Sequence, residues 1–175
     1  MGVSLQLAGD GDVAAIAALM NGAFRGTAAQ QGWNVETFIK GTRTTEELLR
    51  EEMAGGAQYL VAKADGTGAL RGCVSLQALD PVRWYLGALT VDPALQSAGF
   101  GSELLRSAEE YAMARGARWM EITVVNVREA LMAWYERRGY VRTGEVRPFP
   151  YGDDRYGVPT RDDLEFVVME KELGG

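Results

Sequence analysis

The sequence predicts an α/β (α+β) fold in which helices cover a mixed β-sheet. Its 175 residues are a usual length for one domain, so we expect a single domain over residues 1–175. Apolar residues make up 47% of the chain, enough to bury a core without disulfides or metals. Segments with the period of a strand alternate with segments of helical spacing, and several strands follow one another in the middle of the chain. This order of elements predicts the mixed sheet.

The first part of the chain predicts one strand and one helix. Residues 3–7 alternate apolar and polar side chains, as in a short strand. Asp10 or Asp12 can then cap a helix whose apolar side chains share one face through Phe24.

The next part predicts an irregular segment, a second helix and a hairpin. Residues 25–43 are rich in Gly, Gln and Thr, which is typical of irregular structure. Thr44 followed by Glu47 is a capping-box signature, so we expect a helix to begin there. Residues 59–64 and 69–79 have the pattern of two strands joined by a glycine-rich turn.

The second half of the chain predicts two strand–helix units and a closing pair of strands. The run from Trp84 to Val91 is almost wholly apolar, as in a central strand buried on both faces. The 16 residues from Arg147 to Asp162 form a long loop rich in Pro, Gly and aromatic residues, and such loops are often functional. The other expected elements are helices over residues 104–112 and 129–138 and strands over residues 118–125, 140–146 and 164–170.

Composition excludes several classes of function. With 24 acidic and 18 basic residues the formal charge is −6, so we expect no general binding to nucleic acid or membranes. The chain has no histidine, which excludes Ser-His-Asp and Cys-His catalysis and imidazole metal sites. Cys73, the only cysteine, lies in an apolar strand, so we expect a buried thiol and no metal centre. Without a targeting signal or a membrane-length apolar run, a cytoplasmic protein is expected.

The most informative stretch runs from Leu89 to Ser102. A buried strand leads through Asp92-Pro93 into a glycine turn that opens a helix. Small residues let the backbone approach an anion, and the N–H groups at the start of a helix bind phosphate. No Gly-Lys pair occurs in the chain, which excludes a nucleotide P-loop. Leu104 stands where a dinucleotide fingerprint has its third glycine; that fingerprint and a turn without a ligand remain alternatives.

Two short motifs follow a known pattern on the expected elements. One is Gln96-x-x-Gly99-x-Gly101 after a strand ending in Val-Asp-Pro, and the other is AWYERRGY, from Ala133 to Tyr140. They resemble the acyl-CoA-binding motif Q/R-x-x-G-x-G/A and the LYEKLGF segment of the GNAT acyltransferase superfamily. The expected element order is similar to that of the family over essentially the whole chain. The resemblance implies a mostly antiparallel sheet of about seven strands flanked by about four helices.

The resemblance also implies acetyl-CoA as cosubstrate. The glycine turn would bind its pyrophosphate, and the end of the preceding strand would pair with the pantetheine arm and polarise the thioester carbonyl. Arg128 stands where the family often has a coenzyme-contacting asparagine, so it either meets a coenzyme oxygen or is a solvated arginine of the first helical turn. The coenzyme-binding candidates are Leu89, Thr90, Val91, Gln96, Ser97, Ala98, Gly99, Phe100, Gly101, Ser102 and Arg128.

Two side chains are candidates for proton transfer. The resemblance implies that Tyr135 protonates the departing sulfur, which suits a phenol with a reference pKa of about 10; the alternative is simple packing beside Trp134. Many family members carry a carboxylate base on the strand that corresponds to residues 84–91, and here that strand has none. Glu121 on the next strand is therefore the candidate base, unless it faces solvent or pairs with an arginine.

In the family, the segment after the first helix and the last hairpin loop border the acceptor pocket. Here Trp33, Glu36, Tyr151 and Asp153 are the candidate contacts, and aromatic rings with carboxylates suit a cationic amine, although they are also ordinary in loops. The resemblance thus implies an N-acetyltransferase that passes acetyl from acetyl-CoA directly to a primary amine of a small molecule or peptide. A non-catalytic acetyl-CoA-binding module and a protein N-terminal or lysine acetyltransferase are the alternatives. Dimers are common in the family, so a homodimer is one expected assembly.

Overall fold

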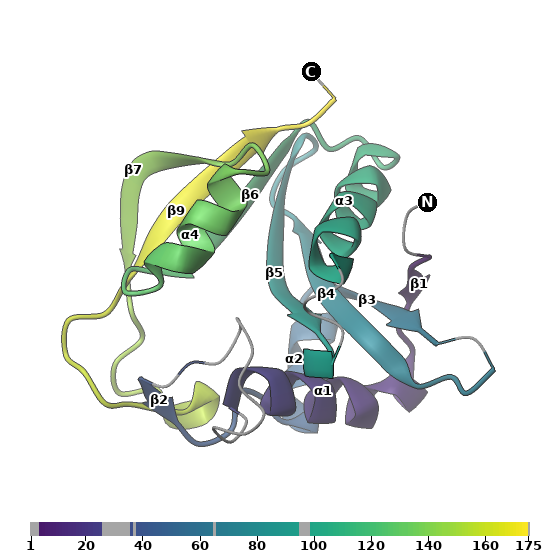
Figure 1. The fold of residues 1–175 in the computed structure, drawn as a ribbon, viewed down its shortest axis with the longest axis horizontal. Coiled ribbons are helices and arrows are strands. Elements are labelled where there is room, and N and C mark those ends of the chain that lie inside the picture. Colours follow the sequence, from purple (N-terminus) through teal and green to yellow (C-terminus); the bar gives the residue numbers. More distant parts are fainter. Residues whose placement is uncertain (1–3, 26–35, 37, 65, 95–98, 175) are drawn as a thin grey trace.

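Helices and strands form one layered arrangement around a seven-stranded sheet (Figure 1). The computed structural model describes residues 4–25, 36, 38–64, 66–94 and 99–174. None of the described helices is long and apolar enough to cross a membrane. In chain order the elements are β1 (Gln6–Leu7), a 3₁₀ turn (Asp10–Asp12), α1 (Val13–Arg25), β2 (Ile39–Lys40), α2 (Glu46–Ala54), β3 (Gln58–Lys63), β4 (Leu70–Ala78), β5 (Arg83–Val91), α3 (Phe100–Met113), β6 (Trp119–Val125), α4 (Glu129–Glu136), β7 (Val141–Pro148), a second 3₁₀ turn (Asp154–Tyr156), β8 (Val158–Pro159) and β9 (Glu165–Glu172).

The large sheet has the strand order β1-β3-β4-β5-β6-β9-β7 and is antiparallel except between β5 and β6. A parallel pair needs a crossover connection, and α3 supplies it. The fold class expected from the sequence is therefore confirmed. Only three residue pairs join β5 to β6, from Arg83–Trp119 to Tyr85–Glu121. Beyond Tyr85 the two strands diverge, as Figure 1 shows, and the candidate site lies between them.

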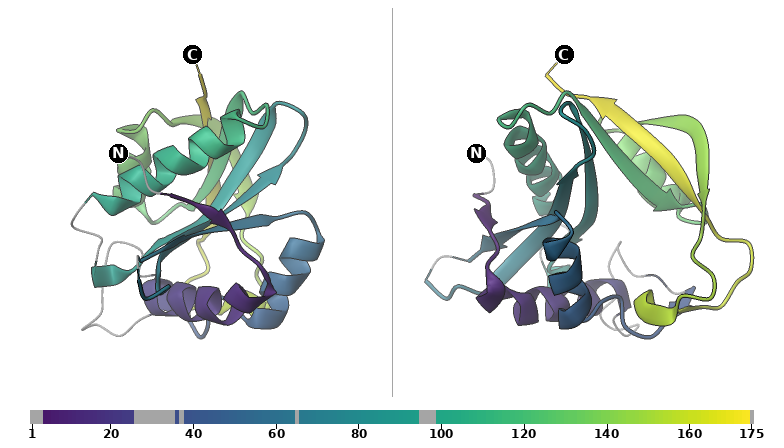
Figure 2. Two further views of the ribbon diagram at one scale, coloured as in Figure 1. Left: turned by 90° about the vertical axis from the view of Figure 1, so that its right-hand side faces the viewer. Right: turned by 180° about the vertical axis from the view of Figure 1, so that it is seen from behind.

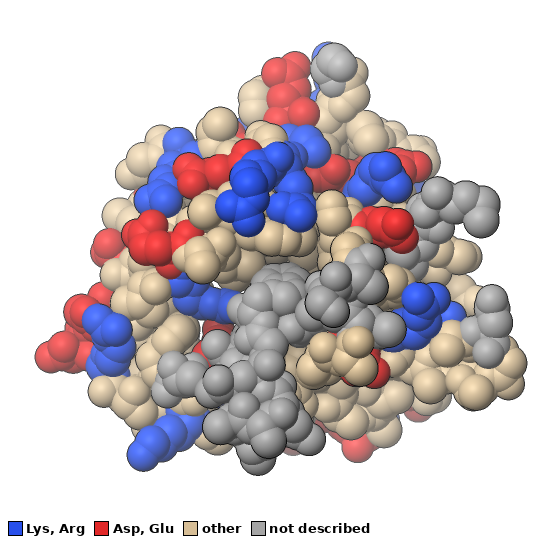
Figure 3. Space-filling view, viewed as in Figure 1, with Lys and Arg blue, Asp and Glu red and all other residues tan. Residues whose placement is uncertain are grey.

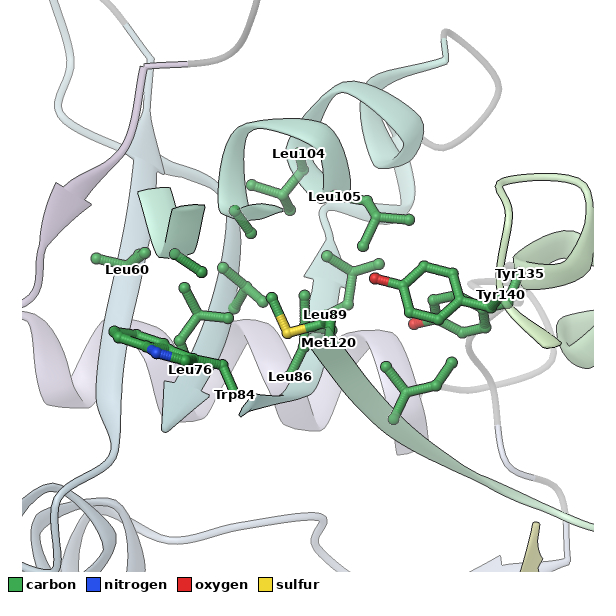
Figure 4. Packing of buried hydrophobic residues seen from close by; sticks show 14 of the residues in the cluster. Leu60, Leu76, Trp84, Leu86, Leu89, Leu104, Leu105, Met120, Tyr135 and Tyr140 are labelled. Carbon is green, nitrogen blue, oxygen red and sulfur yellow. The ribbon is translucent and has the colours of Figure 1, made fainter. Parts of the chain in front are cut away.

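Helices cover both faces of this sheet (Figure 2). In β3, Tyr59 and Val61 join the apolar cluster under α1 and α2, whereas Leu60 and Ala62 join the cluster under α3 and α4. This division is what the period-two alternation of a strand requires. Figure 4 shows the second cluster, in which leucines of α3 meet those of β4 and β5.

The structure corrects two local expectations. The cap of α2 is Thr45 rather than Thr44: the Thr45 hydroxyl accepts a hydrogen bond from the Leu48 N–H at 3.1 Å, whereas the Thr44 N–H donates to Asn21 Oδ1 at 3.0 Å. The segment 25–43, expected to be irregular, contains β2, which pairs with β8 from the long loop. Two segments so far apart in the chain meet only in the folded protein, so no local pattern predicts their pairing.

Candidate active site

A pocket of about 530 Å³ opens where β5 and β6 diverge, a volume usual for small-molecule sites. Its wall takes in the second half of each strand, residues 85–89 of β5 and 122–125 of β6. Residues from α1, α2, α4 and the loop after β7 also line it, as do residues of β2, β3, β4 and β9. Both apolar and charged side chains line this wall, so the pocket can hold a molecule of mixed character.

β5 is irregular where it borders the pocket. Its register against β4 shifts between Cys73 and Ser75, whose partners are Thr90 and Gly87, so β5 holds one extra residue there. Within this bulge Ala88 has a φ of +52°, a left-handed conformation that costs a non-glycine residue about 1–2 kcal/mol. The Thr90 hydroxyl donates to the Ala88 carbonyl at 2.8 Å and holds the bulge. Backbone strain of this kind collects at ligand sites.

The three strand residues expected to bind the coenzyme lie at and beyond this bulge. Leu89 lines the pocket, whereas the side chains of Thr90 and Val91 are fully buried. On their other edge, Thr90 and Val91 pair with β4, so any contact they make with a ligand must come from the backbone edge that faces β6.

α3 begins at the glycine turn. Gly99 is its N-cap, with a φ of +76° that glycine adopts without strain, and none of the described side chains caps the helix. The first backbone hydrogen bond runs from the Glu103 N–H to the Gly99 carbonyl at 3.3 Å. The N–H groups of Phe100, Gly101 and Ser102 therefore have no acceptor within the helix, which makes its start a place for an anion.

Two arginines flank this start of α3. Arg138 donates from Nε to Ser102 Oγ at 3.2 Å, and its guanidinium lies 3.7 Å over the ring of Trp134. The guanidinium of Arg71 lies 4.5 Å over the ring of Phe100. Figure 3 shows basic side chains gathered where α4 approaches α3. Sequence reasoning missed both arginines, although the Arg-Arg pair inside the AWYERRGY segment was a signal for one of them.

Tyr135 of α4 lies on the pocket wall and is 6% exposed. Its ring packs edge-on against Trp134 and Tyr140, with centroids 5.0 and 5.4 Å away, and Figure 4 shows the two tyrosines side by side. Burial raises the pKa of its hydroxyl, against a smaller lowering by the charge of Arg128. The phenol therefore stays protonated at neutral pH, the state that a proton donor requires.

A buried charge network holds the neighbour of Tyr135 in place. The Tyr140 hydroxyl donates to Glu109 of α3 at 2.7 Å, and Lys171 of β9 donates to the same carboxylate at 3.0 and 3.2 Å. These bonds join α3, β9 and the segment after α4, so they fix the ring against which Tyr135 packs.

Glu121, the base expected from the sequence, lies outside the pocket wall. Its carboxylate accepts a hydrogen bond from Arg147 of β7 at 3.0 Å and lies 3.9 Å from Arg83 of β5. Pairing with an arginine was one of the alternatives for this residue.

A carboxylate that the sequence did not single out does line the pocket. Glu52, near the end of α2, accepts a hydrogen bond from the Tyr59 hydroxyl at 3.2 Å. Burial raises the pKa of Glu52, while the charge of Arg43 and the Tyr59 hydrogen bond act in the opposite direction. A carboxyl group with a raised pKa at a pocket wall is suited to accepting a proton. Nothing marks it in the sequence, because it sits in an ordinary amphipathic helix.

Glu36 lies between two buried arginines at the pocket. Its carboxylate is 3.2 Å from Arg25 Nη2 at the end of α1 and 3.8 Å from Arg128 Nη1 before α4. None of the three side chains is more than 10% exposed, and all three line the pocket. Burial lowers the pKa of both guanidiniums, and Glu36 opposes this. Arg128 is therefore not the solvated arginine that was one of the two expectations for this position.

Of the other acceptor candidates in the described part of the chain, one lines the pocket and one does not. Asp153 lines the pocket, but it accepts hydrogen bonds from Arg155 at 2.9 and 2.8 Å, which lower its pKa. Tyr151 lies outside the pocket wall, and its hydroxyl donates to the Arg161 carbonyl at 2.8 Å and accepts from the Leu164 N–H at 3.0 Å. The remaining site residues expected from the sequence lie outside the described part of the chain: Trp33, Gln96, Ser97 and Ala98.

Cys73 is fully buried, which confirms the inert thiol expected from the sequence. Burial raises the pKa of this thiol to about 12, so it carries no charge at neutral pH. It lies in the cluster under α1 and α2 rather than on the pocket wall.

Comparisons with known proteins agree with this geometry. Residues 25–140 match the family model described as Acetyltransferase (GNAT) family. No curated protein sequence matches the chain significantly. Similar solved structures include a candidate phosphinothricin N-acetyltransferase (TM-score 0.70, 20% identity, 99% of each chain). The ribosomal-protein-alanine N-acetyltransferase of Brucella melitensis is also similar (TM-score 0.67, 22% identity, 98% of this chain and 100% of that one). A further one is a GNAT family acetyltransferase of Elizabethkingia anophelis with acetyl-CoA bound (TM-score 0.57, 17% identity, 71% of this chain and 82% of that one).

Proposed function

Because the chain belongs to the GNAT acetyltransferase family, we propose that it transfers acetyl from acetyl-CoA directly to a primary amine of a small molecule or peptide. The observation that carries this proposal is the pocket between the diverging strands β5 and β6, with the buried phenol of Tyr135 on its wall. From β5 the chain continues into α3, whose first N–H groups face outward. The pocket thus adjoins the end of β5, and the proposed anion site lies at the start of α3, the next helix in the chain.

The residues present suit the chemical groups of acetyl-CoA. The start of α3, with Arg71 and Arg138, would hold the pyrophosphate. The bulged end of β5, at Ala88 and Leu89, would hold the extended pantetheine arm through backbone groups. Bound there, acetyl-CoA supplies an activated acetyl thioester.

The protein's own contribution is then proton transfer and orientation. Transfer forms a C–N bond, breaks the C–S bond, releases one proton from the amine and adds one to the sulfur. Tyr135 holds a proton at its hydroxyl for that sulfur. Glu121 and Glu52 are the two candidates to receive the amine proton, directly or through water, and the pocket geometry favours Glu52. The buried, uncharged Cys73 disfavours a covalent acyl-enzyme.

Thermal unfolding with and without acetyl-CoA, followed by thiol release over amines, amino acids, polyamines and peptides, tests the proposal. We expect stabilisation by acetyl-CoA and thiol release with at least one amine. The central claim is wrong if acetyl-CoA has no effect on unfolding. Stabilisation without thiol release with any acceptor would identify a binding module, and release with peptides alone would identify a protein acetyltransferase.

Tyr135→Phe tests the proton donor. It keeps the buried ring and removes the hydroxyl, so we expect kcat to fall by about 10²–10⁴-fold with little change in the Kd for acetyl-CoA. The matched control is Tyr111→Phe in α3, which removes a hydroxyl bonded to Gln58 away from the pocket. Unchanged turnover in Tyr135→Phe would refute the role.

The acceptor contacts proposed from the sequence are tested in the same assay. Asp153→Asn removes a charge at the pocket wall, so we expect a higher KM for the acceptor. Glu36 is proposed to act within its arginine pair, and Tyr151 through the loop after β7. Trp33, which lies outside the described residues, stays a proposed contact on the sequence alone. An unchanged KM in Asp153→Asn and Tyr151→Phe would move the acceptor site away from the loop after β7.

A further inference from the structure

The cluster of Arg25, Glu36 and Arg128 carries an excess positive charge at the pocket. Two guanidiniums face one carboxylate, at 3.2 and 3.8 Å, and an arginine does not lose its proton in a protein. Because none of the three side chains is more than 10% exposed, water screens this charge poorly. The cluster therefore favours an anion in the adjoining space.

The other two carboxylates on the described part of the pocket wall, Asp153 and Glu52, each interact with an arginine outside the cluster. Asp153 is engaged by both Nε and Nη2 of Arg155, and the charge of Arg43, which also acts on Arg25, opposes the raised pKa of Glu52. The sequence of residues 26–35 and 37, which adjoins Glu36 in the chain, contains no acidic residue. An anionic group of the ligand would balance this charge.

The charge lies close to the reaction centre rather than to the coenzyme's phosphates. Arg128 and Tyr135 line the same pocket, and the charge of Arg128 lowers the pKa of the Tyr135 hydroxyl against the effect of burial. The start of α3, with its own two arginines, is the place proposed for the pyrophosphate. An anion at the cluster would thus sit near the amine that is acetylated.

Apolar groups line the same pocket as the charged cluster. Phe149 and Phe166 stack with centroids 5.5 Å apart, and both face the pocket together with Leu131. This surface can bury an apolar substituent of the acceptor, whereas the cluster takes its charged end.

Resting on the acetyltransfer proposed above, we infer that the acceptor is a compact amine with an adjacent anionic group, of the α-amino acid type, whose carboxylate is held by Arg25 and Arg128. Glu36 sets the strength of this hold, because it neutralises one of the two guanidiniums. The two arginines act as specificity-determining residues for the acceptor.

Thiol release with matched acceptors tests the inference. L-Methionine, L-phenylalanine and L-leucine are each compared with their amide and their decarboxylated amine, with rates expressed per free amine because these groups change the amine pKa. For the side chain that the pocket accepts, we expect kcat/KM to be about 10- to 100-fold higher for the acid than for the amide. Equal values, or a preference for the amides and decarboxylated amines, would overturn the inference while leaving acetyltransfer intact. Thiol release with no amine at all would instead count against the proposed function.

A charge series separates recognition from structural support. Glu36→Gln raises the net charge of the cluster by one, so we expect the acid-to-amide ratio to rise, whereas Arg25→Gln and Arg128→Gln should bring it toward one. A purely structural cluster would lower turnover of acid and amide alike and leave the ratio unchanged. Arg25→Lys keeps the charge and should retain a ratio above one, which covers the case that Arg25→Gln fails to fold.

Two further measurements complete the test. Arg50→Gln, an exposed arginine of α2 paired with Asp10, is the matched control and should not change the ratio. The KM for acetyl-CoA is measured for each variant. A raised KM for acetyl-CoA in Arg128→Gln with an unchanged acid-to-amide ratio would overturn the inference, since Arg128 would then serve the coenzyme.

Discussion

Gly72 of β4 lies beneath the start of α3 and leaves no room for a methyl group. A Cβ at this position would lie 2.9 Å from the Thr90 carbonyl oxygen, 3.0 Å from Leu104 Cδ2 and 3.1 Å from Phe100 Cε1. The carbonyl belongs to the backbone of a central strand and cannot turn aside. β4 and β5 must therefore shift apart, and the side chains of Leu104 and of Phe100, the first residue of α3, must move with them.

The size of the effect follows from these contacts. Adding one methyl group to a close-packed core costs about 1–3 kcal/mol, so we expect Gly72→Ala to lower the free energy of unfolding by that amount. If the displaced start of α3 loses one charge-assisted hydrogen bond to a phosphate, about 1.5 kcal/mol, the Kd for acetyl-CoA rises about tenfold.

Urea unfolding and calorimetric titration with acetyl-CoA measure the two effects. Gly22→Ala in α1 is the control, because nothing lies within 4 Å of a Cβ there and its φ is not left-handed. Glycine lowers helix stability, so this control should be more stable than the parent by about 0.5–1 kcal/mol. A Gly72→Ala protein as stable as the parent, with unchanged affinity, would refute the argument that contact with β4 positions the start of α3.

Three further predictions concern buried groups. Cys73→Ala should still release coenzyme A from acetyl-CoA, because burial raises the pKa of the Cys73 thiol to about 12 and this thiol is therefore not a nucleophile. A folded but inactive variant would contradict this. Tyr140→Phe removes a 2.7 Å hydrogen bond to the buried Glu109 and should lower the free energy of unfolding by about 1.5–3 kcal/mol in urea. Burial raises the Glu52 pKa, so the contribution of this group to stability is present below the ordinary carboxyl pKa and is lost as pH rises through the raised value. Glu52→Gln should therefore gain in stability relative to the parent as pH rises above the ordinary carboxyl pKa and through the raised value, and the opposite trend in urea midpoints would count against the buried carboxyl.

Local patterns predicted most of the fold. The apolar run expected at residues 84–91 is β5, Arg83–Val91, and the expected hairpin is β3 and β4. The apolar periodicity of a segment is a property of that segment alone, so it predicts the strand without knowledge of the tertiary structure. The β2–β8 pair depends on two segments about 120 residues apart, and the extra residue at Ala88 depends on pairing with β4. Neither leaves a local pattern.

The candidate site was only partly predictable for the same reason. Tyr135 and the start of α3 lie in contiguous motifs, and both were found. Glu52 becomes notable only through its burial in the fold, and the arginine that engages Glu121 comes from a different strand, 26 residues further on. Pairing of this kind is set by the tertiary structure, which single-sequence patterns do not contain.

The short junction between β5 and β6 has a consequence for the stability of the whole protein. Among the described strands, three residue pairs make up the strand pairing between the half-sheet β1-β3-β4-β5 and the half-sheet β6-β9-β7. A ligand bound between the two half-sheets contacts both of them and therefore stabilises their association. At 100 times its Kd such a ligand adds about 2.7 kcal/mol to the free energy of unfolding. If acetyl-CoA is that ligand, the free energy needed to open β6-β9-β7 rises with the acetyl-CoA concentration. Amide hydrogen exchange in these three strands would then slow as acetyl-CoA is added.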